Sequence, residues 1–375
     1  MSQHPDCLVI GGGLIGMLTA RELSRAGATV QLLERGDTGR ESSWAGGGIL
    51  SPLYPWRYPD AVTLLAQASQ AVYPELIQAV EAESGISAEY LKSGLLIPDC
   101  DEIEAAQAWA KRFSVKTEIT EPDEVIDIAP EISRGLCINK GIWLPKVAQV
   151  RNPRLAQALR VSLEQSGVEV ITSCPVDHIE TQSGRLSAVV TADGQSHAAG
   201  LVVVAGGAWS AGLLAPLGLD IPVQPVRGQM LLYKTLPGTV RRIILNRDRY
   251  VIPRQDGRVL VGSTLEHTGF EKQTTQAART ELEAEACRIV PALAEFPVET
   301  HWAGLRPGSP DGVPFIGACP GAEGVYINTG HYRNGVVLGA ASAQLLAAIA
   351  LGNESSLPIQ AYSPEYLLGS QRAVV

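Results

Sequence analysis

The chain has 375 residues, of which 45% are hydrophobic and 18% charged, with 38 glycines and 6 cysteines. This length suggests two domains, or one domain interrupted by another, and the low charge argues against a disordered chain or a coiled coil. The net charge of −9 excludes nucleic acid as an expected partner, because phosphate binding needs a basic surface. The cysteines form no CxxC pair and no cysteine–histidine cluster, so we expect no metal site, no disulfide framework and a reduced, cytoplasmic location.

Two uncharged stretches, 200–219 and 335–352, are long enough to be tested as membrane spans. The first is interrupted by glycines and by Pro216, which favours a strand, a turn and a short helix. The second contains Gln344 and is interpreted as a buried C-terminal helix. No basic segment precedes the first apolar run, so we expect neither a signal peptide nor a membrane segment.

The N-terminal 34 residues have the pattern of a complete βαβ unit. An apolar strand at 7–10 enters the sequence GGGLIG, a helix is predicted over 14–26, and a second strand over 28–33 ends at Glu34.

The GGGLIG segment matches the GxGxxG fingerprint of dinucleotide-binding proteins. In this pattern Gly11 allows the tight turn, Gly13 lets the backbone approach a pyrophosphate, and Gly16 permits close helix packing. The helix N-terminus supplies free N–H donors for phosphate, and Glu34 would bind an adenosine ribose and repel a 2′-phosphate. The expected cofactor contacts from this unit are Gly11, Gly13, Leu14, Ile15, Gly16, Glu34 and Arg35.

The rest of the chain alternates between two kinds of pattern. Buried-strand and helix patterns return in the middle and at the end, whereas 223–261 alternates as antiparallel strands with one face in solvent would. Hairpin signals stand at 183–184 and 193–194. The other expected elements are helices over 61–84, 101–112, 275–290 and 335–351, β-rich sequence over 168–190, and strands over 201–205 and 324–330.

We therefore predict a mixed α/β (α+β) fold in which a Rossmann-like domain is interleaved with an antiparallel-sheet domain. The dinucleotide-binding domain is assigned to residues 1–84, 146–221 and 303–375, and the second domain to 85–145 and 222–302.

The fingerprint alone does not choose between FAD and NAD, which both use it. Two further glycine-rich segments, 202–209 and 328–335, each end a buried strand and open a helix. A cofactor that touches three such places is long and rigidly held, which favours FAD.

Six segments carry a resemblance to a known family: LVIGGGLIG with LLER, ESSWAGGG, VVVAGGAWS, GSTLEHTGF, AGLRPGSPDGVPFIG and TGHYRNGV. Together they span nearly the whole chain and resemble the D-amino-acid oxidase family of FAD-dependent amine oxidases, most closely its glycine-oxidising bacterial members. The resemblance implies an FAD-binding domain interleaved with a substrate-binding domain, whose antiparallel sheet is flanked by helices.

The resemblance also implies catalytic and substrate-binding residues. Arg306 is similar to the arginine that holds the substrate carboxylate, Tyr250 to the tyrosine that helps to position the amino acid, and Arg333 to a second arginine near the flavin. An arginine fork matches a carboxylate through two parallel hydrogen bonds. A structural salt bridge for Arg306 and ordinary packing for Tyr250 are the alternatives.

Further cofactor contacts follow from the same resemblance. Trp44 departs from the family, which carries a small residue there, and Cys319 lies beyond the motif in which a flavin-linking cysteine would stand, so we expect noncovalent FAD. The additional expected contacts are Ser42, Ser43, Ala45, Gly46, Gly47, Val176, Ala205, Gly206, Trp209, Gly330, His331, Arg333, Asn334 and Gly335.

The implied reaction is oxidative deamination of glycine, sarcosine and small D-amino acids by hydride transfer from Cα to flavin N5. The imine hydrolyses to a 2-oxo acid and ammonia or an amine, and O2 reoxidises the flavin to give hydrogen peroxide. His267 and His331 are expected to be structural hydrogen-bonding residues rather than bases. The resemblance further implies a role in forming the thiazole of thiamine, and a homotetramer.

Two other functions stay open. A D-amino-acid dehydrogenase would pass its electrons to a membrane quinone, which the absence of an expected membrane segment disfavours. A noncatalytic dinucleotide-binding sensor would not need the carboxylate-binding set of Arg306, Tyr250 and Arg333.

Overall fold

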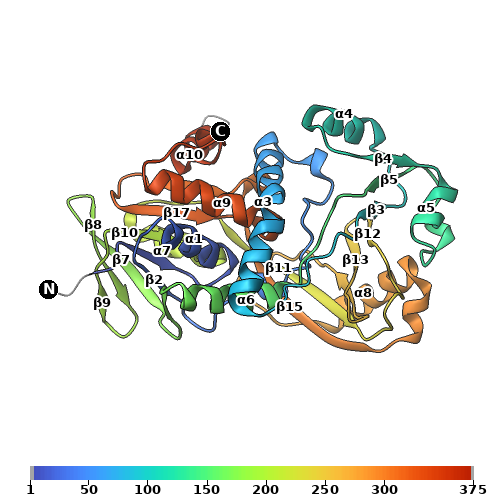
Figure 1. Ribbon diagram of the computed structural model, residues 1–375, viewed down its shortest axis with the longest axis horizontal. Coiled ribbons are helices and arrows are strands. Elements are labelled where there is room, and N and C mark those ends of the chain that lie inside the picture. The colour runs from blue at the N-terminus through green and yellow to red at the C-terminus, as the bar shows by residue number, and fades with distance from the viewer. Residues whose placement is uncertain (1–3, 373–375) are drawn as a thin grey trace.

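Two lobes, each built on its own sheet, make up the computed structural model, which describes residues 4–372 (Figure 1). A six-stranded sheet has the order β16–β17–β10–β1–β2–β6, and an eight-stranded sheet the order β15–β11–β14–β13–β12–β3–β5–β4. A separate three-stranded sheet, β7–β8–β9, lies in the first lobe. The predicted mixed α/β fold is therefore confirmed.

The first sheet is the parallel one, with β16 antiparallel at its edge. Its strands are short and, apart from the edge strand β6, mostly buried, because helices or further strands cover both faces. They are β1 (Cys7–Ile10), β2 (Val30–Leu33), β6 (Glu169–Ile171), β10 (Leu201–Val204), β16 (Phe315–Ala318) and β17 (Val325–Thr329).

Helices pack on one face of this sheet through one hydrophobic core, and a smaller core fills the other face. The first face is covered by α1 (Leu14–Arg25), α3 (Asp60–Ser84), α6 (Asn152–Gln165) and α9 (Gly335–Ala350), and α10 (Pro364–Arg372) lies beside β16. The second face is covered by β7 (Val176–Gln182), β8 (Arg185–Thr191), β9 (Ser196–His197) and α7 (Ser210–Leu214).

Among the described residues, one helical stretch, Tyr332–Ala350, is long and apolar enough to cross a membrane by length and composition alone. Most of this stretch is buried inside the protein, where α9 packs against α1 and α3. This packing agrees with the interpretation of the segment as a buried C-terminal helix.

The second lobe is built on the eight-stranded sheet, whose strands are antiparallel to their neighbours except at the β12–β3 pair. Helices α4 (Ile103–Phe113), α5 (Pro122–Ile128) and α8 (Gln276–Ile289) surround it. The strands are β3 (Leu95–Ile97), β4 (Glu118–Thr120), β5 (Gly141–Leu144), β11 (Gln224–Tyr233), β12 (Ile243–Asn246), β13 (Arg249–Pro253), β14 (Val259–Gly262) and β15 (Val298–Gly308).

The expectation that the strands of 223–261 have one face in solvent is wrong. Strands β12, β13 and β14 are buried almost throughout, because both faces of the sheet are covered. On one face Val251 packs in a core with residues of α8 and α5, and on the other Ile252 packs in a core that includes Tyr54.

The two sheets draw their strands from different parts of the chain. Every strand of the six-stranded sheet falls within 1–84, 146–221 or 303–375. The strands of the eight-stranded sheet fall within the predicted second domain, 85–145 and 222–302, except for β15. This strand crosses the predicted boundary at 302/303 and continues to Gly308. The strand thereby runs from the second sheet to the place where the lobes meet.

A partly buried ion pair joins three helices of the first lobe. Arg21 of α1 is only 4% exposed, and its guanidinium lies 2.6 Å from the Glu83 carboxylate of α3. Ser162 of α6 donates a hydrogen bond to the other carboxylate oxygen of Glu83.

We expect Glu83→Gln to lower the free energy of unfolding by about 1–3 kcal/mol, because it leaves the charge of Arg21 buried without a counter-charge. The matched control is Glu164→Gln, which removes an exposed pair with Arg160 on α6 and should cost less than ~0.5 kcal/mol. Urea unfolding of the three proteins measures both changes. Equal losses for the two variants would contradict the role of the pair.

Candidate active site

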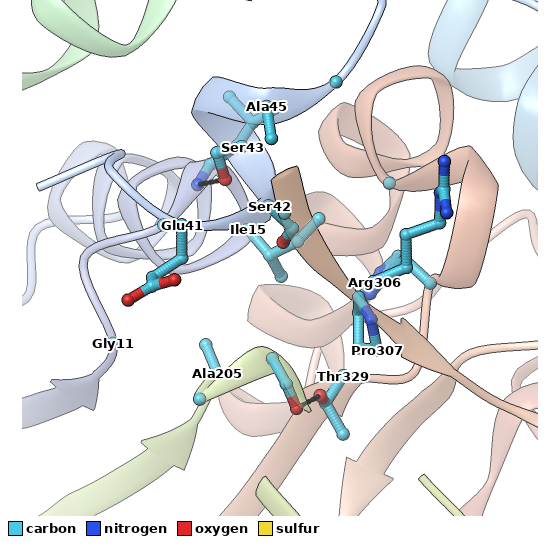
Figure 2. A pocket seen from close by; sticks show the side chains of 18 of the residues that line it. Gly11, Ile15, Glu41, Ser42, Ser43, Ala45, Ala205, Arg306, Pro307 and Thr329 are labelled. Atoms are coloured by element: carbon cyan, nitrogen blue, oxygen red, sulfur yellow. Dashed lines mark hydrogen bonds between the residues drawn. The ribbon is translucent and has the colours of Figure 1, made fainter. Parts of the chain in front are cut away.

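A cavity of about 480 Å³ lies where the two lobes meet and receives residues from both. Figure 2 shows the Gly11 turn and the α2 helix (Ser42–Ala45) on one side, Ala205 and Thr329 below them, and Arg306 across the space. The volume lies within the range of ordinary ligand pockets.

The turn between β1 and α1 forms the glycine-rich wall of the cavity. Gly11 has φ +111°, and a Cβ there would lie 2.5 Å from the Ala205 carbonyl oxygen. Gly13 is the N-cap residue of α1 and makes no side-chain cap, and the N–H of Leu14 donates to Ser43 Oγ at 2.8 Å. The turn therefore presents backbone N–H groups at a helix N-terminus, the arrangement that binds phosphate.

Glu34 stands at the end of β2 in the cavity wall. Its carboxylate accepts hydrogen bonds from the N–H groups of Gly12, at 2.6 Å, and Gly36, at 2.9 Å. These two donors fix the carboxylate, and the remaining lone pairs can accept from a ribose hydroxyl. Nearby, the Arg35 guanidinium lies 3.5 Å from the centre of the Trp209 ring.

Most of the predicted site residues line this one cavity. Three do not: Gly16 packs beneath the turn against Gly11, Gly330 packs against Phe315 and Ser309, and Asn334 is buried outside the lining. Those in the lining are Gly11, Gly13, Leu14, Ile15, Glu34, Arg35, Ser42, Ser43, Ala45, Gly46, Gly47, Val176, Ala205, Gly206, Trp209, Tyr250, Arg306, His331, Arg333 and Gly335.

Arg306 projects from β15 and has no carboxylate within ion-pair distance among residues 4–372. Its guanidinium donates to Ser263 Oγ at 2.7 Å and to the Thr264 carbonyl oxygen at 3.2 Å. Burial lowers the pKa of Arg306, Tyr250 opposes this shift, and the neighbouring Arg333 adds to it. The group stays charged at working pH, so an anion in the cavity would supply the missing counter-charge.

Two glycines of the β11–β15 pair allow close contacts in the cavity wall, one with Arg306 and the other with α2. Gly228 stands opposite Gly304, and a Cβ on Gly228 would clash with the Arg306 guanidinium. A Cβ on Gly304 would clash with Ala45 of α2. Neither glycine was expected in the site, although a glycine inside a strand is a sign of close approach.

Tyr250 and Arg333 flank Arg306 from different elements. Tyr250 on β13 is buried and its hydroxyl donates to Met230 Sδ at 3.3 Å. Arg333 lies in the short helix Tyr332–Asn334 that precedes α9. Met230 and Ser263 also line the cavity; Ser263 lies within the GSTLEHTGF segment, but neither residue was predicted as part of the site.

The two histidines have different surroundings. His267 is exposed and lies outside the cavity lining. His331 is buried, its Nε2 lies 2.9 Å from Ser342 Oγ, and burial lowers its pKa to about 3. The imidazole is therefore neutral at working pH.

Trp44 does not line the cavity. Its ring packs edge-on against Trp302 with the centroids 5.3 Å apart, and Trp302 Nε1 donates to the Ala45 carbonyl oxygen at 3.2 Å. The Trp44 ring thus packs α2 against Trp302 on the side away from the cavity.

The lining fits a bound dinucleotide. A side chain at position 11 would occupy the space of the turn. The first N–H groups of α1 have no side-chain cap from Gly13 and are free to bind a ligand. Two buried polar atoms of lining residues, His331 Nδ1 and Asn328 Oδ1, have no hydrogen-bond partner among the described residues. Such atoms are costly unless something in the site pairs with them.

The parallel sheet, its glycine turn and the cavity between the two lobes define a dinucleotide-binding protein. Residues 6–349 match the model of the DAO family, described as FAD dependent oxidoreductase, and the chain belongs to this family. It is 46% identical to glycine oxidase of Pseudomonas aeruginosa, over 95% of this chain and 98% of that one. It is 45% identical to glycine oxidase of Pseudomonas putida, over 96% and 99%.

The fold agrees with these relatives. The crystal structure of glycine oxidase from Geobacillus kaustophilus has a TM-score of 0.91 and 25% identity, covering 96% of this chain and 98% of that one. The protein is thus an FAD-dependent enzyme, as the resemblance predicted.

A buried arginine outside every predicted motif ties the second lobe to the cavity wall. Arg254 follows β13 and is 8% exposed. It donates to Gln149 Oε1 at 2.7 Å, to the Val150 carbonyl at 3.0 Å and to the Gly47 carbonyl at 2.9 Å. Burial lowers its pKa to about 10.

We expect Arg254→Gln to weaken FAD binding about tenfold or more, because a charged hydrogen bond to the Gly47 carbonyl is worth about 1.5–3 kcal/mol. Titration of the flavin-free protein with FAD, followed by flavin fluorescence, measures the Kd. Arg258→Gln is the control, since Arg258 in the same turn pairs with Glu299 at the surface. An unchanged Kd for Arg254→Gln would show that the bond does not position the wall.

Proposed function

We propose that the protein oxidises glycine and other small amines, such as sarcosine and small D-amino acids. The products are a 2-oxo acid, ammonia or an amine, and hydrogen peroxide. The observation that carries the proposal is the charged, buried Arg306 with no carboxylate partner among the described residues. The glycine oxidases of two Pseudomonas species, both about as long as this chain, support the choice of substrate.

The residues of the cavity bind and orient the substrate. Arg306 would hold the carboxylate through two hydrogen bonds, with Tyr250 and Arg333 on either side of it. FAD, when bound, accepts the hydride from Cα and passes the two electrons to O2. The contribution of the chain is then orientation of Cα and stabilisation of the carboxylate.

Nothing in the lining serves as a strong base for the substrate ammonium. His331 is neutral and engaged with Ser342. Of the two acidic lining residues, Glu34 accepts from backbone N–H groups and Glu41 pairs with Arg35 and Lys272. The amine must therefore react in its uncharged form.

The wider role is also a proposal. The chain is 32% identical to the bifunctional protein ThiO/ThiG of Synechocystis, over 98% of this chain but only 55% of that protein. This match supports a role in supplying the glycine-derived imine for the thiazole of thiamine. A homotetramer is proposed from the family resemblance, and a cytoplasmic location from the cysteine pattern of the sequence.

Anaerobic reduction separates the candidate functions. Glycine added to the purified holoenzyme without air should bleach the flavin, and air should restore the colour with one peroxide per turnover. Reoxidation by a quinone analogue but not by O2 would instead identify a dehydrogenase. A protein that glycine does not bleach would refute the oxidase.

We expect Arg306→Ala to raise the KM for glycine about 30-fold or more while FAD stays bound, because truncating one partner of a buried charge pair costs about 2–5 kcal/mol. Gly228→Ala tests the same contact without removing the charge, since the new Cβ would displace the guanidinium. Steady-state kinetics and the flavin absorbance measure the two effects. An unchanged KM in both variants would refute the assignment.

We also expect kcat/KM for glycine to rise about tenfold per pH unit below the pKa of the substrate amine, because only the neutral amine reacts. Arg306 remains protonated throughout, and His331, with its pKa of about 3, does not titrate in this range. A pH profile between 6 and 10 measures the slope. A rising limb centred near pH 6.5 would instead indicate a catalytic histidine.

A further inference from the structure

We propose that Met230 is a modification site, at which hydrogen peroxide formed in the cavity oxidises the thioether to a sulfoxide that weakens substrate binding. The enzyme would in this way be slowed by its own product. This inference rests on the proposed function, because that reaction supplies the peroxide.

Met230 is the methionine that faces the cavity. The chain has three methionines, at positions 1, 17 and 230. Met1 lies outside the described residues, and Met17 is fully buried in the core of the first lobe, outside the cavity lining. Met230 lines the cavity and is only 2% exposed, so an oxidant reaches its sulfur from the cavity. Peroxide formed there therefore has access to this thioether.

The surroundings of the Met230 sulfur leave it able to react. The Tyr250 hydroxyl donates a hydrogen bond to Sδ at 3.3 Å, which engages one lone pair of the sulfur and leaves another to attack peroxide. Gly262 stands opposite Met230 in the β11–β14 ladder, and a Cβ there would lie 3.0 Å from Sδ. The absence of a side chain at Gly262 thus leaves room around the thioether.

Cys174 also lines the cavity and is the alternative target for peroxide. A thiol reacts through its thiolate, and burial raises the pKa of Cys174, so this thiol stays protonated at working pH. A thioether needs no deprotonation before it reacts. Met230 is therefore the better target of the two.

The oxidation needs no reactant besides peroxide. A sulfur lone pair forms the S–O bond as the O–O bond breaks, so the thioether loses two electrons and the peroxide gains them. The departing oxygen takes the proton of the transferred one and leaves as water. One thioether and one hydrogen peroxide thus give one sulfoxide and one water.

The sulfoxide changes the contacts of the residues that bind the carboxylate. Its oxygen is a stronger acceptor than the thioether, so it holds the Tyr250 hydroxyl that the proposed function gives to the substrate. Met230 and Gly228 stand on the same face of β11, and the Arg306 guanidinium occupies the place that a side chain at Gly228 would take. The added oxygen therefore also competes with the substrate carboxylate for Arg306.

The test treats the holoenzyme with hydrogen peroxide in the absence of glycine. Trypsin releases Met230 in the peptide 228–234, whose mass shows whether an oxygen has been added. We expect one added oxygen, a KM for glycine raised about tenfold, the value of one hydrogen bond to a charged group, and an unchanged amount of bound FAD. A methionine sulfoxide reductase should restore both the mass and the KM.

Met230→Leu removes the sulfur and keeps an apolar side chain of similar volume. Whatever the KM of this variant before treatment, peroxide should not raise it further. Met17→Leu is the matched control, because Met17 lies in the core away from the cavity. This control should lose affinity for glycine as the wild type does.

An unmodified peptide 228–234 after peroxide treatment would overturn the proposal. So would an equal rise in KM in Met230→Leu, which would place the damage at another group such as Cys174. Acetate, a carboxylate without an amine, keeps the test independent of turnover. Its Kd, measured from the flavin spectrum, should rise about tenfold in the treated wild type whether or not glycine is oxidised, so failure of the proposed function and failure of this inference give different results.

Discussion

The buried charge of Arg306 is the constraint on which the site depends. A guanidinium taken out of water loses several kcal/mol of solvation, and here only Ser263 and Thr264 replace part of it. The glycine at 228 exists opposite this group because any side chain there would occupy its place. The described residues therefore hold a buried cation without an acidic partner, and in the function proposed above the carboxylate of the substrate would complete the pair.

Maintaining that cation requires the two lobes to be fixed against each other. Strand β15 belongs to the second sheet but brings Arg306 to the first lobe, where Gly304 packs directly against Ala45. Arg254 reaches from the second lobe to the Gly47 carbonyl. Close backbone contacts on one side and buried hydrogen bonds on the other make the cavity a property of the interface rather than of either lobe.

The sequence was sufficient where local patterns decide structure. The βαβ unit and the helices at 61–84 and 335–351 appear within two residues of their predicted limits, because periodicity and glycine punctuation are local. Strands β3, β4 and β5, each three or four residues long, were not predicted. The prediction that the strands of 223–261 have one face in solvent was wrong, because the helices that cover the sheet are distant in sequence. Arg254 and Gly228 were missed for the same reason, as their partners are known only after folding.

The distribution of acids in the cavity favours the proposal that the substrate is recognised through its carboxylate rather than its amine. Glu34 and Glu41 are satisfied by backbone or side-chain donors at the nucleotide part of the cavity, whereas Arg306 and Arg333 lack acidic partners among residues 4–372. An ammonium group gains nothing beside two guanidinium groups, so the electrostatics that bind the carboxylate also favour loss of the amine proton. In the proposed function, one arrangement of charges would thus both select the substrate and prepare it for hydride transfer.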